Sequence, residues 1–497
     1  MKKKYIYLTA LIFSASIYTS CQKDKLNPVP QTSITAETSF ATPARISNQV
    51  LSLYSSLKNG SFYGGRVVIY GDIRGEDFIN ETGNLVTASD VWSLNLTNSS
   101  TSVKSLWSQA YLTINRCNVF LDGMAAGGTT TVGNTTTSNA YLGEARLIRA
   151  LSYYSLLQFY ARPYADKNGA NPGIPLRLKG NTGGENYDQA KATVAEVYTQ
   201  ILNDLNFAET NLPVTNSSAY NNTTRAHRNT VIALKTRVYL SMQKYAEVIT
   251  EANKMVSATA PFTATTGVAN ALTTDIVSVF RAAYTTPESI FSMPMTNVAG
   301  DYPGTQNQLG YYFYSNSTTV GATEFSLNQT GIIANTGWKT TDKRRSFVVA
   351  GGTTALASKR FLAKYISPAA NNFLDYVPVI RYTEVLLNLA EARARVASAS
   401  AVPDVQALAL LNAVRNRSDA TTTFAPLTNT DLINLILTER RIEFLGEGLR
   451  NNDLMRLVQT IPVKGSAPQK SLGETGYIWP ISSDELSLNK LIGGDNN

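Results

Sequence analysis

Residues 439–456 read ERRIEFLGEGLRNNDLMR, and the charged side chains in this stretch recur at helical spacing. Glu439, Glu443 and Glu447 stand four residues apart, with arginines at positions 440, 441 and 450 beside them. This pattern predicts ion pairs within a helix and bridges from that helix to its neighbours. Catalytic acids for glycoside hydrolysis have to face a substrate from two sides, whereas acids interleaved with arginines on one helix are placed to be neutralised. The stretch therefore favours a structural role.

Further helices are predicted on either side of this stretch. Apolar residues recur at intervals of three and four, which is typical of helices buried along one side. The predicted helices are residues 46–57, 102–124, 139–161, 193–212, 230–242, 244–256, 376–396, 404–417, 431–445 and 449–458. Gln243 alone separates two of them, so those two are expected to pack antiparallel. A run rich in glycine and threonine, residues 127–137, is predicted to be a loop.

Residues 258–375 have a different composition, rich in Gly, Thr, Asn and aromatic residues, with prolines throughout. Only short helices or strands fit such a pattern, and an irregular span of this length inside a folded chain is usually functional. The sequence thus predicts a mainly α protein in which helix pairs form a scaffold overlaid by long loops and one mostly irregular segment.

The N-terminus has the order of a secretory signal. Lys2, Lys3 and Lys4 precede an apolar run from Tyr5 to Ile17, which is too short to span a membrane. Cys21 follows where the run stops, and this arrangement resembles the bacterial lipobox, in which the cysteine receives lipid. We therefore divide the chain into a signal peptide (1–20), a lipid-anchored tether (21–36) and one body (37–497); an ordinary signal peptide is the alternative.

Composition limits the possible functions. The formal charge is +8, but basic and acidic residues alternate locally, so no nucleic-acid-binding stripe is present in the sequence. Two cysteines and one histidine are too few for a zinc site of four such ligands. Cys117 lies on an apolar helix stripe and is expected to be buried, and His227 is expected at a helix start or on the surface. Nucleotide-binding and hydrolase motifs are missing, so we expect no catalytic residue, metal or cofactor.

Two sets of residues are candidates for binding. The acidic cluster Asp72, Glu76, Asp77 and Glu81 could hold calcium, but it lacks the spacing of a known loop and a solvated turn is favoured. Loop aromatics offer ring faces for sugars, and burial in an irregular core is the alternative for each of them. The tentative ligand-binding residues are Tyr70, Trp92, Asn95, Tyr311, Tyr312, Tyr314 and Trp338. Of the adjacent pair Tyr311 and Tyr312, one is expected to point outward.

Several motifs in a fixed order carry a family resemblance. They are residues 144–150 (EARLIRA) with 159–163 (FYARP), 172–176 (PGIPL), 233–240 (ALKTRVYL), 381–384 (RYTE), 411–417 (LNAVRNR), 439–456 and 477–481 (YIWPI). Together these segments resemble the SusD/RagB family across nearly the whole chain after Cys21.

The resemblance implies helix pairs of tetratricopeptide type and a non-catalytic role. It implies a lipoprotein of the outer membrane, facing outside, that captures glycan or peptide for a SusC-type TonB-dependent transporter. The family's ligand contacts lie in variable loops, so the resemblance assigns no contact residue and no particular ligand. A surface glycoside hydrolase and a helical-repeat adaptor between proteins are the alternative functions.

Overall fold

The structure is a computed structural model that describes residues 36–298, 300–302, 304–314, 324–366, 368–369, 372–398 and 401–496. The predicted signal peptide and Cys21 lie outside these residues, as does all but the last residue of the predicted tether.

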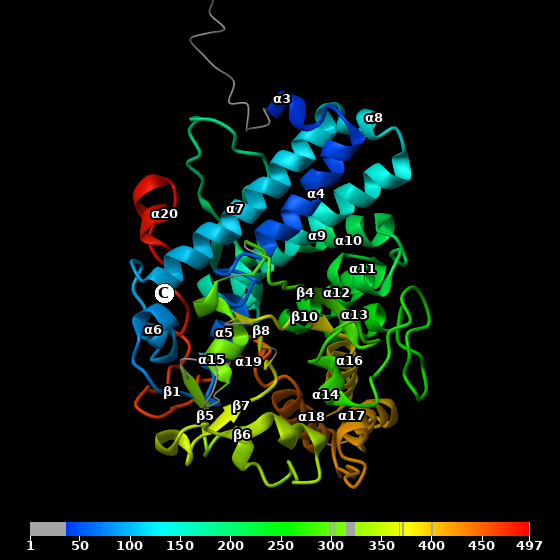
Figure 1. Ribbon diagram of the computed structural model, residues 1–497, viewed down its shortest axis with the longest axis vertical. Helices are drawn as coiled ribbons and strands as arrows, with labels where there is room; N and C mark the ends of the chain where they lie inside the picture. Colours follow the sequence, from blue (N-terminus) through cyan, green and yellow to red (C-terminus); the bar gives the residue numbers. More distant parts are fainter. Residues whose placement is uncertain are drawn as a thin grey trace, which may run out of the picture.

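Packed helices form the body of the protein (Figure 1). They are α4 (Pro43–Leu57), α7 (Thr101–Gly123), α9 (Thr135–Tyr160), α10 (Val194–Asn211), α12 (Arg228–Ser241), α13 (Tyr245–Ala252), α16 (Tyr382–Val396), α17 (Val405–Ser418), α18 (Asn429–Glu443) and α19 (Arg450–Arg456). Further helices are α3 (Ala36–Ser39), α5 (Arg66–Ile73), α6 (Ser89–Trp92), α8 (Thr129–Val132), α11 (Ala219–Thr224), α14 (Ile276–Val279), α15 (Leu309–Phe313) and α20 (Ser483–Leu488).

Helices that are neighbours in the chain also pack together. α7 contacts α9, α9 contacts α10, α10 contacts α12, α12 contacts α13, and α16 contacts α13, α17 and α18. α9 is the central element, because almost every side chain from Gly143 to Tyr160 is buried, which marks a helix enclosed on all sides. Its first turn is capped by Asn134, whose side chain accepts a hydrogen bond from the Thr137 amide at 2.9 Å.

The predicted secondary structure is wrong in two segments. The glycine and threonine run is largely helical, since it contains α8 and the start of α9, which Asn134 caps. Residues 377–381 form a strand, β10 (Val377–Arg381), instead of the first turns of α16. The β-branched run Val377, Val379 and Ile380 suits a strand, and Pro378 suits the edge of a sheet. Elsewhere the predicted helices agree with the observed ones to within a few residues.

The segment after α13 consists of short elements. Its strands are β4 (Ser289–Met293), β5 (Phe325–Leu327), β6 (Val348–Ala350), β7 (Arg360–Leu362), β8 (Pro368–Ala369) and β9 (Asn372–Phe373). β1 (Phe78–Asn80) joins β5, β7 and β6 in a four-stranded sheet of order β1-β5-β7-β6, and β10 pairs with β4. β2 (Pro172–Pro175) pairs with β3 (Lys191–Thr193). Figure 1 shows the four-stranded sheet at the end of the molecule opposite α3.

The C-terminal segment closes the core beside α9. Trp479 is buried, with ring centroids 5.2 Å from Tyr70, 4.9 Å from Phe159 and 5.5 Å from Tyr160. Its backbone N–H donates to the Phe159 carbonyl at 2.7 Å, and the Asn496 amide donates to the Tyr160 carbonyl at 2.8 Å. The end of the chain is therefore part of the core.

Both residues singled out by composition are buried. Cys117 is a free thiol in the core, as predicted. His227 begins α12 as expected, but it is fully buried and not on the surface.

Candidate functional site

The arginines and glutamates of the 439–456 stretch form a buried ion network. Glu443 lies 3.0 Å from Arg381, 2.8 Å from Arg344 and 2.7 Å from Arg417. Glu439 accepts from Arg415 at 2.8 Å, and Glu447 lies 2.7 Å from Lys364. The partners come from other elements, so the predicted bridges between elements are present, whereas these glutamates pair with no residue of α18 itself.

The charges in the ion network are mutually neutralised. Burial alone would raise the pKa of Glu443, but the positive charges of Arg417, Arg381 and Arg344 outweigh it and hold that pKa well below its ordinary value. An ionised, fully engaged carboxylate cannot act as a general acid towards a sugar. The ion network thus favours a structural role over the hydrolase alternative.

The acidic cluster near β1 is also engaged. Glu76 lies 2.6 Å from Arg450, and Asp77 lies 2.5 Å from Arg441, while Asp72 accepts from the Gly448 amide at 2.7 Å. Glu81 pairs with Lys359. All except Glu81 are buried, so the solvated turn predicted for these acids is wrong. Over the described residues no group of acidic, histidine or cysteine side chains is arranged to hold a metal ion.

Four of the seven predicted ligand-binding residues lie in the core. Tyr70, Trp92, Tyr312 and Trp338 are all less than a tenth exposed. The Trp92 indole N–H donates to the Phe78 carbonyl at 2.7 Å, which fixes the ring inside the protein. These four rings present no open face to a ligand, and we correct their assignment to packing.

The other three predicted residues reach the surface. Tyr311 and Tyr314 are half-buried, and Asn95 is exposed just beyond α6. Tyr311 is the outward member of its pair, since Tyr312 is buried. α15 packs against β5, and α6 packs against β1, so both groups lie by the same sheet. We call residues 80–87, 309–314 and 324–327 the loop face.

Buried polar contacts fix the conformation of the loop face. The Arg66 guanidinium donates to the Asn307 side chain at 2.7 Å and to the Val86 carbonyl at 2.9 Å, and it lies 5.2 Å from the centroid of the Tyr312 ring. Glu324 is buried and accepts from the Thr87 hydroxyl at 2.6 Å. These contacts leave Leu85 and Val86 exposed (68% and 58%) on a fixed support. The loop face is therefore fixed in conformation by buried contacts.

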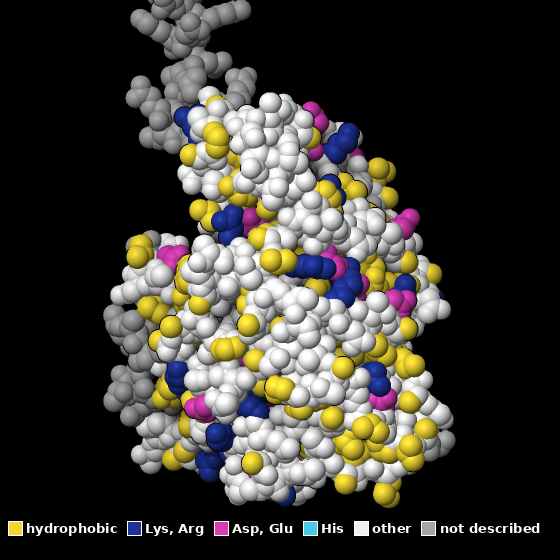
Figure 2. Space-filling view, turned by 90° about the vertical axis from the view of Figure 1, so that its right-hand side faces the viewer, with side chains coloured by type: hydrophobic (Ala, Val, Ile, Leu, Met, Phe, Trp, Pro, Cys, Tyr) yellow, Lys and Arg dark blue, Asp and Glu magenta, His cyan; other side chains and the backbone are white. Residues whose placement is uncertain are grey.

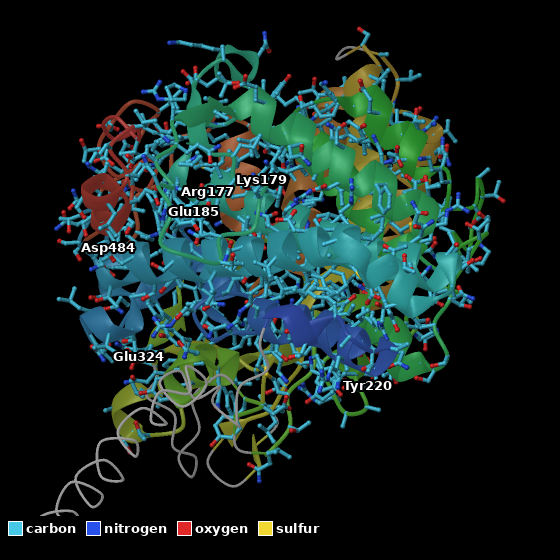
Figure 3. The ribbon with its side chains drawn as sticks, turned by 90° about the horizontal axis from the view of Figure 1, so that it is seen from above. Arg177, Lys179, Glu185, Tyr220, Glu324 and Asp484 are labelled. Carbon is cyan, nitrogen blue, oxygen red and sulfur yellow. The ribbon has the colours of Figure 1, made fainter. Side chains whose placement is uncertain are left out.

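A large groove lies away from the loop face (Figure 3). We call it the α7 groove: it is lined by α7, by residues 176–189 and by residues 485–490, and its volume is about 1010 Å³. Figure 3 shows Arg177, Lys179 and Glu185 gathered beside α7, whereas Glu324 of the loop face lies elsewhere. This groove was not predicted from the sequence, although the polar stretch at residues 179–189, which contains Tyr187, was a usable signal.

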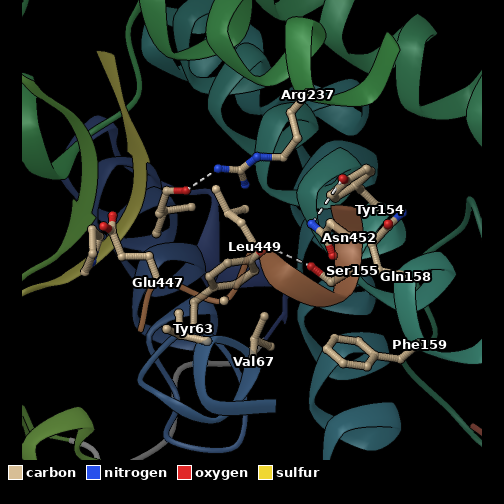
Figure 4. Close-up of a pocket in the computed structure, with 14 residues that line it drawn as sticks. Tyr63, Val67, Tyr154, Ser155, Gln158, Phe159, Arg237, Glu447, Leu449 and Asn452 are labelled. Atoms are coloured by element: carbon tan, nitrogen blue, oxygen red, sulfur yellow. Dashed lines mark hydrogen bonds between the residues drawn. The ribbon is translucent and has the colours of Figure 1, made fainter. Parts of the chain in front are cut away.

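A smaller cavity lies between α9, α12 and the segment that precedes α19 (Figure 4). Its volume is about 30 Å³, and Tyr63, Gln158 and Arg237 are among the residues that line it. Such a space holds about one water molecule and no sugar ring.

Charged side chains form no large patch of one sign on the face seen in Figure 2, where basic and acidic groups lie in small mixed clusters. Among the helices of the described residues, none is both long and apolar enough to cross a membrane.

Stacked helix pairs that carry a face of short strands and loops define a class of helical binding scaffolds. Two family models match the chain in succession. Residues 29–240 match the SusD-like family described as starch-binding associating with outer membrane, and residues 243–494 match the SusD family. The chain belongs to the SusD family.

Known proteins agree over almost the full length. A SusD-like protein of Formosa agariphila is 25% identical over 531 residues, which cover 97% of each chain. The crystal structure of a SusD superfamily protein from Bacteroides fragilis is 32% identical, with a TM-score of 0.78 and coverage of 91% of this chain and 99% of its own. These matches confirm the family resemblance and the mainly α, tetratricopeptide-like fold.

One structural relative was solved with a sugar. It is surface glycan-binding protein A of Bacteroides thetaiotaomicron in complex with laminarihexaose. It is 18% identical, with a TM-score of 0.71 and coverage of 92% of this chain and 100% of its own, so this likeness shows the fold alone.

Proposed function

We propose that this protein is a lipoprotein of the outer membrane, facing outside, that binds glycan and delivers it to a SusC-type TonB-dependent transporter. The observation that carries the proposal is the match of two SusD-type family models over residues 29–240 and 243–494, the first described as starch-binding and associated with the outer membrane. The laminarihexaose complex of a protein of the same fold supports glycan over peptide.

The loop face is the proposed glycan site. Tyr311 packs edge-on against Tyr312 at 5.9 Å, and Tyr312 stacks on Phe325 at 6.0 Å, so the outer ring rests on a rigid aromatic support. A sugar ring can stack on Tyr311 or Tyr314, and Asn95, exposed just beyond α6, stays a predicted hydrogen-bonding residue. Each aromatic contact contributes about 0.5–1.5 kcal/mol. Two or three of them with hydrogen bonds give a Kd in the ~μM to mM range.

Weak capture suits a tethered protein. A lipid on Cys21 would hold the protein beside its transporter at high effective concentration, so tight binding is not needed and release is fast. We also propose that the protein leaves its ligand intact, because the glutamates of the 439–456 stretch are engaged in the ion network.

Ligand titration tests the site. Laminarihexaose and then a glycan and peptide array are applied to the mature chain, the Tyr311→Ala variant and the Tyr314→Ala variant. Each variant is expected to bind the glycan about threefold to tenfold more weakly, the loss of one aromatic contact. Tyr220→Ala is the matched control, because Tyr220 is 48% exposed on α11, away from the loop face (Figure 3). Unchanged affinity in both loop-face variants would place the site elsewhere.

Fractionation and co-purification test the anchor and the partner. Cys21→Ser is expected to release the protein from the membrane fraction, and a SusC-type transporter is expected to co-purify with the wild type in detergent. A helical adaptor would bind a protein partner but no oligosaccharide, and a hydrolase would shorten the oligosaccharide during long incubation. Either result would contradict the proposed function.

A further inference from the structure

We propose that two copies of this protein associate through an apolar patch at the end of the helical body, with α17 of one copy against α17 of the other across a two-fold axis. The patch, which we call the end patch, consists of Val396, Val402, Val405 and Leu427. These side chains are 59%, 81%, 83% and 85% exposed. Such self-association goes beyond glycan binding and does not involve the loop face.

Hydrogen bonds of one buried residue, Asn429, bring the end patch together. The Asn429 side-chain amide donates to the Ser398 carbonyl at 3.0 Å, and its side-chain oxygen accepts from the Asp404 N–H at 3.0 Å. Its backbone N–H donates to the Ala401 carbonyl at 3.1 Å. Each residue of the end patch is at most two positions in the sequence from one of these four bonded residues. The four aliphatic side chains therefore surround one point of the fold.

Charge is scarce on the surface around the end patch. Between positions 396 and 430 the sequence has four charged residues, Asp404, Arg415, Arg417 and Asp419. The side chains of the last three are buried. Soluble protein surfaces carry charge on about a quarter of their residues or more, whereas the centre of a protein interface is depleted of charge. The surface around the end patch thus has the composition of an interface.

α17 lies at the edge of the helical body and is apolar on its outer side as well. It packs against α16 and α18, and Figure 1 shows it at the lower right of the molecule. Val405 and Ala409, one helical turn apart, are both exposed on this helix. Hydrophobic side chains also gather in the lower part of Figure 2, which looks onto this side. The last helix pair of a stack normally has a polar outer face, so an apolar one indicates a covering partner.

The area of the end patch suits a weak dimer. Its four side chains together expose roughly 300–600 Å², which equals the largest apolar patch of an ordinary monomer. The Gln406 side chain donates to the Ala258 carbonyl at 3.1 Å, so the exposed, uncharged residues 258–261 border the patch and enlarge it. Two copies then bury roughly 1,000 Å² in total, the lower limit of a specific interface. We expect a dissociation constant of roughly 10–100 μM.

Charges at the border of the end patch fit a second copy of the same patch. Arg393 donates two hydrogen bonds to Asp404, at 2.8 Å and 2.9 Å, and the two side chains are 27% and 21% exposed. A two-fold axis places the same patch on both sides of the contact, so the guanidinium of one copy can face the carboxylate of the other. A partner whose surface carries one sign would bring a like charge against Arg393 or against Asp404. A second copy therefore matches both the apolar centre and the charged border.

Sedimentation equilibrium of the mature chain tests the proposal. The chain carries Cys21→Ser, so that neither a lipid nor a disulfide at that position can join two copies. Between about 1 and 300 μM we expect the mean mass to rise from that of a monomer towards that of a dimer. Val405→Lys and Val405→Glu should each weaken association at least about tenfold, because the axis brings two like charges together. Leu51→Lys is the matched control on α4, where Leu51 is 49% exposed, and should leave association unchanged.

An equimolar mixture of Val405→Lys and Val405→Glu distinguishes a second copy from any other partner. Lysine of one chain then faces glutamate of the other across the axis, so the mixture should regain association at the strength of the wild type or above. Circular dichroism checks that both variants are folded, as expected for a residue that is 83% exposed.

Three results would overturn the proposal. They are a wild type that stays monomeric at about 300 μM, dimers of wild-type strength in both single variants, and a mixture that stays monomeric. The second result would place the contact away from α17. Failure of glycan binding at the loop face leaves these masses unchanged, so the two proposals are tested separately.

Discussion

The ion network and the α7 groove both contain charged side chains, but they use charge in opposite ways. In the ion network each charge is paired, and some have several partners: Arg381 contacts Glu288, Glu443 and Glu447, and all four residues are buried. On the rim of the α7 groove, Lys179 and Glu185 are exposed and, within the described part of the chain, unpaired. Fully paired buried charges fix which elements pack together, whereas unpaired exposed charges remain available to a ligand.

The largest expected difference between the two regions is in stability. Glu443→Ala removes one carboxylate and leaves Arg381, Arg344 and Arg417 with excess buried positive charge, which should lower the free energy of unfolding by about 3–5 kcal/mol. Glu185→Ala is the matched control and should change it by less than about 0.5 kcal/mol. Urea unfolding followed by circular dichroism measures both. Similar losses in the two variants would remove the distinction between the regions.

A smaller difference is expected in pH dependence. The folded pKa of Glu443 is depressed, so its contribution to stability is complete above its ordinary pKa of 4.5 and is lost as the pH falls towards the folded pKa. We expect the free energy of unfolding to fall as the pH drops below about 4.5, with a shallower slope in Glu443→Gln. Urea unfolding at a series of pH values checks this. An equal slope in Glu185→Gln and Glu443→Gln would contradict it.

The smallest expected effect is that of salt. Raising NaCl from 0.05 M to 0.5 M shortens the Debye length from above 10 Å to below it, which screens exposed charges far more than buried ones. The transition midpoint of the protein in urea should therefore stay nearly constant, because the charges of the ion network are buried. A midpoint that shifts as far with salt as it does in Glu443→Ala would contradict the screening expected for buried charges.

The helices could be predicted because the apolar residues on one side of a helix recur every three or four positions. The candidate site depends instead on contacts between residues that are distant in sequence. Leu151 and Tyr154 could be placed inward from spacing alone, and both are buried. Trp92 could not, because its burial depends on the Phe78 carbonyl and on Lys464, whose ammonium lies 5.9 Å from the centroid of the Trp92 ring. β10 was missed because its apolar run continues directly into α16. The α7 groove was missed because its walls come from three separated segments.

The C-terminal segment, which packs beside α9 through Trp479 and Asn496, has a consequence for the order in which the protein folds. Lys464 donates to the carbonyls of Ile73, Arg74 and Gly75, and Asn496 reaches the Tyr160 carbonyl across 336 residues of sequence. Contacts between residues so far apart in the sequence form slowly. The apolar side chains of α9 that pack against Trp479 stay exposed until the residues around Trp479 have been synthesised. A growing chain therefore remains incompletely folded until its C-terminal segment has been made.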